Sequence, residues 1–310
     1  MFDLRNMTTV NEFTLLSFSL LPHLIVPVFC LILMAYIFIM LGNFLIVFLV
    51  LMDSRIQRPM YFFLCNLAVI DLFFVNTTIP NLLMNLTREN KIISLNCCLT
   101  QSYFFFVAGT AEFLLLAVMS FDRYLAICYP LHYPAVMSQR PCIWLIIAVW
   151  FSSFVSTCIP SYLVMKLKFC FSEIDHFFCD IGPLLMNSCT STANIEKCIV
   201  ASSSPMIISF LVTVISYINI IIAIIKVNTS GGKQKIITTC SSHAIVVTLA
   251  YGSCIYLYSQ PTHNQEFDLN KRVSIVNTMV VPLINPFIYT LRNKNFKECV
   301  HDVILRLIKN

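Results

Sequence analysis

The chain has 310 residues, of which 58% are hydrophobic and only 11% are charged, and its mean hydropathy is +0.81. A soluble domain of this length cannot bury so much apolar surface in one core, so the composition excludes an ordinary soluble protein. The formal net charge of +5 is distributed unevenly between the two ends of the apolar segments and does not indicate nucleic-acid binding.

Seven apolar segments are each long enough to cross a bilayer as a helix, which takes about 20 residues. Their apolar runs are continuous and do not alternate, which favours helices over a β-barrel. Asp71 and Glu112 are the charged residues inside these segments, and His243 is a titratable one. The sequence therefore predicts an all-α integral membrane bundle with seven spans, at 24–51, 59–84, 99–121, 141–164, 198–225, 236–258 and 273–291.

The connections between the spans differ in charge. The N-terminus and the loops after the second, fourth and sixth spans hold eight Lys or Arg and nine acidic residues. The opposite side holds twelve basic and four acidic residues. By the positive-inside rule, this predicts a multi-pass membrane protein with an extracellular N-terminus and a cytoplasmic C-terminus.

We divide the chain into an extracellular N-terminus (1–23), a transmembrane domain (24–292) and a cytoplasmic segment (293–310). Apolar residues of the last segment recur on one helical face, which predicts a short amphipathic helix on the inner leaflet. A disordered basic tail is the alternative for that segment. On the outer side, the Asn6-Met7-Thr8 sequon predicts glycosylation of Asn6.

The predicted outer loops contain an odd number of cysteines, so one of them should stay free: Cys97, Cys98, Cys170, Cys179 and Cys189. The longest outer loop, at 165–197, holds three of these cysteines and the aromatic stretch HFFCDIGPLL. We expect this loop to fold over the mouth of the bundle and to be held there by disulfides.

Several motifs follow one another in chain order: Gly42-Asn43, PMYFFLCNLAVID (59–71), Cys98, MSFDRYLAICYPLHYPAVMS (119–138), HFFCD (176–180), Ser216-Tyr217, TTCSSHAIVV (238–247) and PLINPFIYTLRNK (282–294). With these motifs the chain resembles a rhodopsin-like G-protein-coupled receptor along nearly its whole length, and more narrowly an odorant receptor. It departs from the usual pattern at Ser120 and Phe121, where the family usually has Ala and Tyr. It also departs at 57–59 and in the short GGKQK cluster before the sixth span.

The resemblance implies a switch at the cytoplasmic side. Asp122 would hold Arg123 at rest, and activation would free Arg123 to meet the G protein. The resemblance implies that five further residues take part in the switch, with the proline as a hinge: Tyr124, Tyr217, Asn285, Pro286 and Tyr289. The alternatives are an arginine that only reaches toward lipid headgroups and a kink without a switching role. His243 is read as structural or linked to the switch.

The resemblance also implies a ligand pocket in the outer half of the bundle, lined by Ser102, Phe105, Phe106, Gly109, Thr110, Ser202, Pro205, Tyr251, Ile255 and Tyr258. This set is apolar and aromatic with a few hydroxyls, which suits a small, neutral, volatile compound. Amine receptors have an aspartate where Phe105 stands, so a cationic amine is not expected. Ordinary helix packing is the alternative role for each of these residues.

Two disulfides are implied by the same resemblance, Cys98–Cys179 and Cys170–Cys189, which leaves Cys97 free; Cys97–Cys179 is the rival pairing. An allosteric sodium ion is implied between Asp71 and Glu112, with Asn43 and Asn285 nearby. A neutral hydrogen-bond network is the alternative there. We expect no other cofactor.

With this resemblance, the sequence predicts an odorant receptor of the plasma membrane. The resemblance implies that it activates a stimulatory, olfactory-type heterotrimeric G protein and raises cyclic AMP. We expect no enzyme, because no catalytic Ser/His/Asp, metal or phosphate-loop constellation is visible. The alternative is a receptor of the same fold for a non-odorant small molecule. A transporter is less favoured, because no paired broken helices are present and two acids are too few to line a path.

Overall fold

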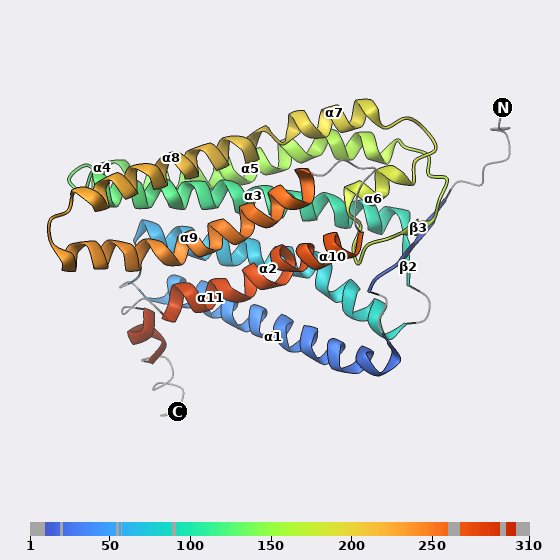
Figure 1. Cartoon of the computed structure of the whole chain (residues 1–310), viewed down its shortest axis with the longest axis horizontal. Helices are drawn as coiled ribbons and strands as arrows, with labels where there is room; N and C mark the ends of the chain where they lie inside the picture. The colour runs from blue at the N-terminus through green and yellow to red at the C-terminus, as the bar shows by residue number, and fades with distance from the viewer. Residues whose placement is uncertain are drawn as a thin grey trace.

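The computed structural model describes residues 10–18, 21–53, 56, 58–88, 91–259, 267–291 and 296–301. The side chains at 235, 239, 258, 259, 267, 268 and 289–291 lie outside that description. The long helices lie side by side along one axis, with strand β1 at one end of the bundle and the short helix 296–301 at the other (Figure 1).

Six helical segments are long and apolar enough to cross a membrane. They are α1 (Pro22–Met52), α2 (Pro59–Thr87), α3 (Leu95–Cys128), α5 (Gln139–Met165), α7 (Ala193–Ser202) continued by α8 (Ser204–Lys226), and α9 (Ser230–Ser259). The seventh predicted span is built from three consecutive pieces, α10 (Phe267–Ile275), the π-helix η4 (Val276–Val280) and α11 (Val281–Leu291). The seven-helix prediction is confirmed, although the last span is not one uniform helix.

Local sequence explains where several of these helices begin. Proline occupies the first turn of α1 and of α2, where its missing N–H costs no helical hydrogen bond. The hydroxyl of Ser94 caps α3 by accepting a hydrogen bond from the backbone N–H of Cys97 at 3.4 Å.

A small three-stranded sheet at one end of the bundle was not predicted. Strand β1 (Glu12–Leu15) lies between β2 (Ile92–Ser94), to which it is antiparallel, and β3 (Glu173–Ile174), to which it is parallel. Phe13 and Leu15 of β1 are fully buried. We call this end of the bundle the sheet end, and the opposite end, which carries the short helix α4 (Tyr133–Val136), the α4 end.

Helix α3 lies at the centre of the bundle and contacts α2, α5, α8 and α9. Its buried positions include the small residues Ala108, Ala111 and Ala117, which let neighbouring helices approach closely. By contrast, α1 and α5 expose large apolar side chains such as Phe48 and Phe151. Apolar side chains on the outside and polar ones inside are the arrangement of a protein whose solvent is lipid.

The short helix 296–301 begins the segment that we predicted to be amphipathic. Phe296 and Cys299 are buried in the core, and the ring of Phe296 lies 6.4 Å from that of Tyr61 of α2. The apolar face of this part therefore packs on the bundle. Residues 302–310, which complete the predicted helix, lie outside the described residues.

The long loop between α5 and α7 forms a roof over the sheet end. Disulfides join Cys98 to Cys179 and Cys170 to Cys189, which are the two pairings that the family resemblance implies. Cys97 is exposed and carries a free thiol. The first disulfide ties the loop to the start of α3, and the second closes a turn within the loop, which also carries α6 (Ile181–Met186).

His176, Phe177 and Phe178 fill the space under this roof. His176 is 2% exposed, and its ring lies against Phe177 with the centroids 4.7 Å apart. Its Nδ1 accepts a hydrogen bond from the backbone N–H of Phe178 at 3.4 Å, and its Nε2 lies 3.4 Å from the hydroxyl of Ser274 in α10. Phe178 in turn packs on Phe105 of α3, with the ring centroids 4.3 Å apart.

An ion pair fixes the roof to the last span. The ammonium group of Lys271 in α10 lies 2.5 Å from the carboxylate of Asp175, and the Lys271 side chain is only 4% exposed. Burial, and next the positive charge of Lys271, lower the pKa of His176 to about 3. His176 is therefore neutral at physiological pH.

This buried histidine predicts a loss of stability in acid. Between about pH 6.5 and about 3 the unfolded chain binds a proton at His176 that the folded protein excludes, so the free energy of unfolding falls as pH falls through this window. The expected slope from His176 alone is at most about 1.4 kcal/mol per pH unit. Thermal unfolding of the purified protein in lipid nanodiscs, between pH 7.5 and 4, measures it.

The matched variant for this measurement is His176→Phe, which keeps an aromatic ring beside Phe177 and Phe178 but does not titrate. All other titratable groups are the same in the two proteins, so the difference between the two pH profiles isolates His176. Identical profiles for the wild type and the variant would contradict the assignment.

Candidate functional site

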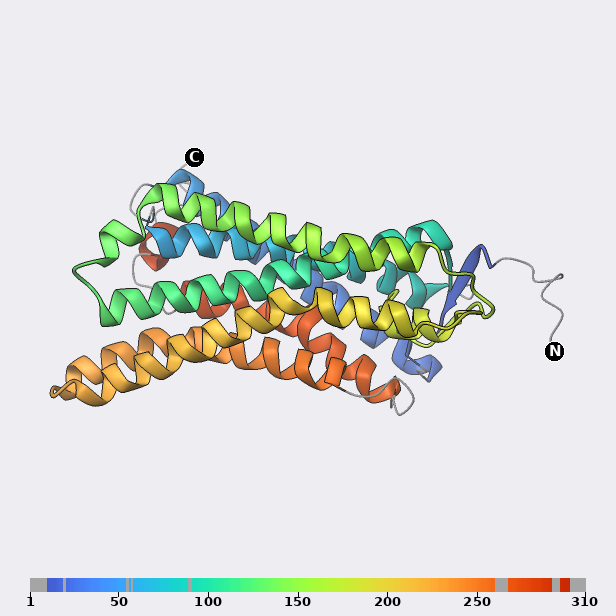
Figure 2. The ribbon, with the colours of Figure 1, turned by 90° about the horizontal axis from the view of Figure 1, so that it is seen from above.

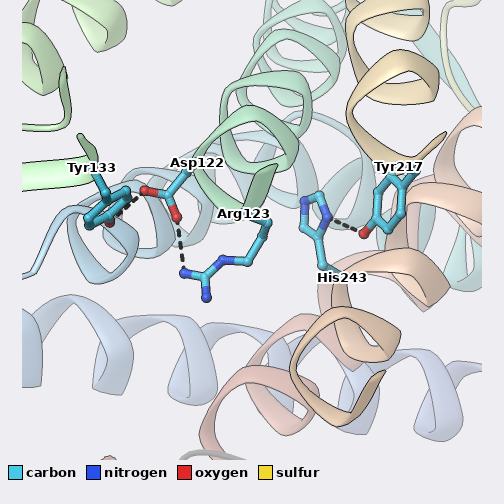
Figure 3. A network of polar contacts seen from close by, with 5 residues as sticks. All are labelled: Asp122, Arg123, Tyr133, Tyr217 and His243. Carbon is cyan, nitrogen blue, oxygen red and sulfur yellow. Dashed lines mark hydrogen bonds and ion pairs between the residues drawn. The ribbon is translucent and has the colours of Figure 1, made fainter. Parts of the chain in front are cut away.

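Three polar residues form a network at the α4 end of α3. The guanidinium of Arg123 lies 3.0 Å from one carboxylate oxygen of Asp122, and the hydroxyl of Tyr133 donates a hydrogen bond of 2.8 Å to the other (Figure 3). Asp122 is fully buried. The negative charge of Asp122 is therefore stabilised by the adjacent cation on α3 and by the hydroxyl of Tyr133 from α4.

The environment of Tyr133 keeps it a hydrogen-bond donor. Burial, and next the neighbouring carboxylate of Asp122, raise the pKa of Tyr133. Its hydroxyl therefore retains its proton and can satisfy the buried carboxylate. The sequence did not reveal this contact, because no periodic pattern links Tyr133 to a residue eleven positions earlier across Pro130.

A second polar pair joins α8 to α9 beside the first network. The hydroxyl of Tyr217 and Nδ1 of His243 are 2.7 Å apart, and the two rings are nearly parallel. Figure 3 shows His243 between Tyr217 and Arg123, with the Arg123 side chain extending toward Asp122. His243 is fully buried, and its Nε2 has no hydrogen-bond partner among the described residues.

Tyr124, the third residue of the predicted Asp-Arg-Tyr switch, lies apart from these hydrogen bonds. Its ring packs on Phe121 and on Tyr129, with centroids 6.1 and 5.6 Å away. The geometry gives Tyr124 a packing role in this form of the protein, while Arg123 and Asp122 carry the charges.

A third polar cluster lies between α1, α2, α3 and α11. The amide of Asn285 donates a hydrogen bond of 2.8 Å to the carboxylate of Asp71. The amide of Asn43 donates to the backbone carbonyls of Ile39 in α1 and Pro282 in α11. Gly42 allows this close approach, because a Cβ at that position would come within 2.9 Å of Pro286.

Four buried oxygen atoms in this cluster lack a hydrogen-bond donor among the described residues. They belong to Asn43 (Oδ1), Asp71 (Oδ1), Glu112 (Oε1) and Asn285 (Oδ1). Glu112 is close enough to Asp71 for the two carboxyl groups to interact electrostatically. Carboxylate and amide oxygens without donors are the ligands that a hard cation requires, so these residues fit the sodium ion that the family resemblance implies.

The buried candidate ligand residues belong to two separate clusters of aromatic side chains. Phe105, buried under the roof, packs on Phe74 and Phe178 and touches Phe106 edge to face. Tyr251 of α9 packs on Phe113 and Phe210 nearer the middle of the bundle. Ser102 is buried near the first group.

Tyr251 is also held by hydrogen bonds that the sequence did not reveal. Its hydroxyl lies 2.9 Å from that of Ser209 in α8 and 3.2 Å from the carbonyl oxygen of Phe113 in α3. Tyr251 therefore joins α3, α8 and α9 at one point. No specific signal in the sequence pointed to Ser209, because α8 also carries other polar residues, such as Thr213, Ser216 and Asn219.

The remaining candidate residues are less enclosed. Gly109 and Thr110 are partly buried on α3, and Ser202 and Pro205 flank the junction between α7 and α8. Ile255 is 50% exposed. Three further predicted residues cannot be placed, because Asn6 and the side chains of Tyr258 and Tyr289 lie outside the described residues.

Comparison with known proteins identifies the family of this bundle. Residues 42–289 match the family described as the 7 transmembrane receptor (rhodopsin family). The human protein named Olfactory receptor 6X1 is 42% identical over 303 residues, which cover 97% of each chain. Human Olfactory receptor 2AP1 is 41% identical over 98% of this chain and 99% of its own.

A mouse relative agrees with the two human ones. Olfactory receptor 6E1 of Mus musculus is 42% identical over 309 residues, covering 99% of both chains. The matched regions therefore span the whole bundle, including the positions of the Arg123 network and of both disulfides. The chain belongs to the rhodopsin family of seven-transmembrane receptors and, within it, to the olfactory receptors.

Proposed function

We propose that this receptor lies in the plasma membrane with its sheet end outside and its α4 end in the cytosol. The excess of Lys and Arg at the α4 end supports this orientation by the positive-inside rule. Both disulfides lie at the sheet end, as expected for a compartment in which disulfides persist. Asn6, which precedes β1, is the proposed glycosylation site.

The proposed ligand is a small, neutral, largely apolar volatile compound bound in the sheet-end half of the bundle. The aromatic rings around Phe105 and the single hydroxyl of Tyr251 support this choice. Such surroundings favour apolar contact with one hydrogen bond for orientation and disfavour a charged ligand. The relatives' common name, olfactory receptor, agrees with an odorant.

The proposed partner at the α4 end is a heterotrimeric G protein of the stimulatory, olfactory type, which raises cyclic AMP. The observation that carries this proposal is the Arg123–Asp122–Tyr133 network, a paired charge at the border of the membrane. Beside it, Leu131 is 92% exposed at the surface that would face the cytosol. A large exposed apolar side chain next to a releasable cation suits the docking of a partner.

Activation is then a shift between two states. In the described state, Asp122 holds Arg123, and the Tyr217–His243 pair holds α8 to α9. An odorant that binds more tightly when α9 moves away favours the state in which Arg123 is free. Pro286 in α11 supplies a second point of bending near the same end.

The proposal predicts an odorant response that depends on Arg123. In cells that display the receptor, members of a volatile panel should raise cyclic AMP in a dose-dependent manner, and Arg123→Ala should abolish the rise at equal surface level. Arg140→Ala, an exposed arginine at the start of α5, is the matched control and should leave the response intact.

A response that survives Arg123→Ala would overturn the role given to that residue. A rise in cyclic AMP that is elicited only by non-volatile compounds would favour the alternative of a receptor of the same fold with another ligand.

We also propose that a sodium ion binds between Asp71 and Glu112, with Asn43 and Asn285 completing its shell. The four buried oxygens without donors support this proposal. The ion would supply a positive charge that offsets two neighbouring carboxylates in a medium of low dielectric constant. A neutral network, with protonated carboxyls, is the competing arrangement.

Sodium binding predicts a specific gain in thermal stability. Exchange of N-methyl-D-glucamine chloride for sodium chloride at constant ionic strength should raise the unfolding midpoint of the purified receptor, because a ligand that binds only the folded state stabilises it. Glu112→Gln, which preserves the shape of the side chain but removes its charge, should weaken or abolish this increase. An equal increase in the wild type and in Glu112→Gln, or none in either, would contradict the site.

A further inference from the structure

A groove of about 260 Å³ lies between α3, α5 and α8, away from the candidate ligand residues. Residues that line it include Ala117, Phe121, Ala148, Ser152, Ile208 and Ser209. Figure 2 shows α5 and α8 approaching each other near the sheet end and separating toward the α4 end, with α3 visible between them. Small side chains on α3 and α5 leave the space between the diverging helices unfilled.

The groove opens on the side of the bundle that faces lipid. Ile208 on its α8 wall is 58% exposed. Ile147, which precedes the lining residue Ala148 on α5, and Leu211, one turn after Ile208 on α8, are 49% and 52% exposed. These helices are apolar enough to span a membrane. A molecule that enters the groove must therefore come from the bilayer and must be soluble in it.

The depth and polarity of the groove restrict its occupant further. On α3 the lining runs from Leu114, near the middle of the helix, to Phe121, two residues before Arg123, so the groove lies within the apolar layer in the half of the bundle toward the α4 end. Among the described lining residues none is charged, and Ser152 and Ser209 supply the hydroxyls. A lipid headgroup cannot be seated there, because a charge at this depth is costly without a partner.

The volume points to a small molecule. A cavity of about 150 Å³ holds benzene, whereas pockets for drug-sized ligands measure about 300–1,000 Å³. We propose that this groove is a second binding site, entered from the bilayer, for small neutral hydrophobic molecules of odorant size. The choice of this chemical class rests on the proposed function, whereas the site itself rests on the groove.

Such an occupant would contact the candidate ligand region through one residue. Ser209 lines the groove, and its hydroxyl is also the partner of Tyr251 at 2.9 Å. A single side chain therefore separates the lipid-facing groove from the point where Tyr251 joins α3, α8 and α9.

Photoaffinity labelling tests the site directly. The full chain in lipid nanodiscs is irradiated with an eight-carbon aliphatic diazirine that bears a terminal alkyne, and adducts are mapped by mass spectrometry. We expect adducts on the groove-lining parts of α3, α5 and α8, and their displacement by an excess of unlabelled octane.

The test variant is Ala148→Phe, which fills the groove from an exposed position on α5 and does not disturb the core. It should reduce groove labelling at least about tenfold, since a single misfit in an apolar pocket costs that much. Cys158→Phe adds the same ring at an exposed position farther along α5 and should leave the labelling unchanged.

The proposal would be overturned by uniform labelling of all lipid-facing helices that neither octane nor Ala148→Phe reduces. That result would show that only acyl chains fill the groove. Because labelling requires neither an agonist nor a G protein, this result is independent of the cyclic AMP response. The site and the proposed function can therefore fail separately.

Discussion

The pairing of Arg123 with Asp122 is the interaction on which the account of this receptor depends. A guanidinium at the border of the membrane is costly unless an opposite charge or water stabilises it. Asp122 supplies that charge, and it is itself fully buried and hydrogen-bonded by Tyr133. Opening the pair costs free energy, because Arg123 loses its opposite charge. New contacts between Arg123 and a partner must offset this cost, which makes the pair suitable as a switch.

The opposite end of the molecule is constructed for rigidity. Two disulfides, a three-stranded sheet and the Lys271–Asp175 ion pair fix the roof to α3 and α10. The roof places Phe178 on Phe105, so side chains that are themselves held in place cover the proposed ligand region at the sheet end. If the ligand binds at this fixed end and the partner at the α4 end, as we propose, the binding free energy of the ligand can be coupled to the release of Arg123 through the helices between them.

Much of this arrangement could be predicted from the sequence. The spans follow from continuous apolar runs, whereas the pairing of Asp122 with Arg123 was implied by the family resemblance. The disulfide pairings could not be derived from residue spacing and depended on the family resemblance. Contacts between distant segments were missed because no local pattern encodes them: the strands at Glu12–Leu15 and Glu173–Ile174 are too short to be recognised alone. The Tyr133–Asp122, Ser209–Tyr251 and Lys271–Asp175 contacts were missed for the same reason.

The measurement that tests the central claim most directly is the distance between the α4 ends of α5 and α9 in the purified receptor without G protein. Spin labels attached to unnatural amino acids at the exposed positions Arg140 and Ile237 report this distance in double electron–electron resonance measurements. If Asp122 holds the resting state with the help of Tyr133, then Tyr133→Phe, which removes only the hydroxyl, should increase the population with a longer distance about tenfold. Tyr129→Phe, a nearby tyrosine outside the Asp122 network, should leave the distances unchanged. An unchanged distribution in both Tyr133→Phe and Asp122→Asn would contradict the account.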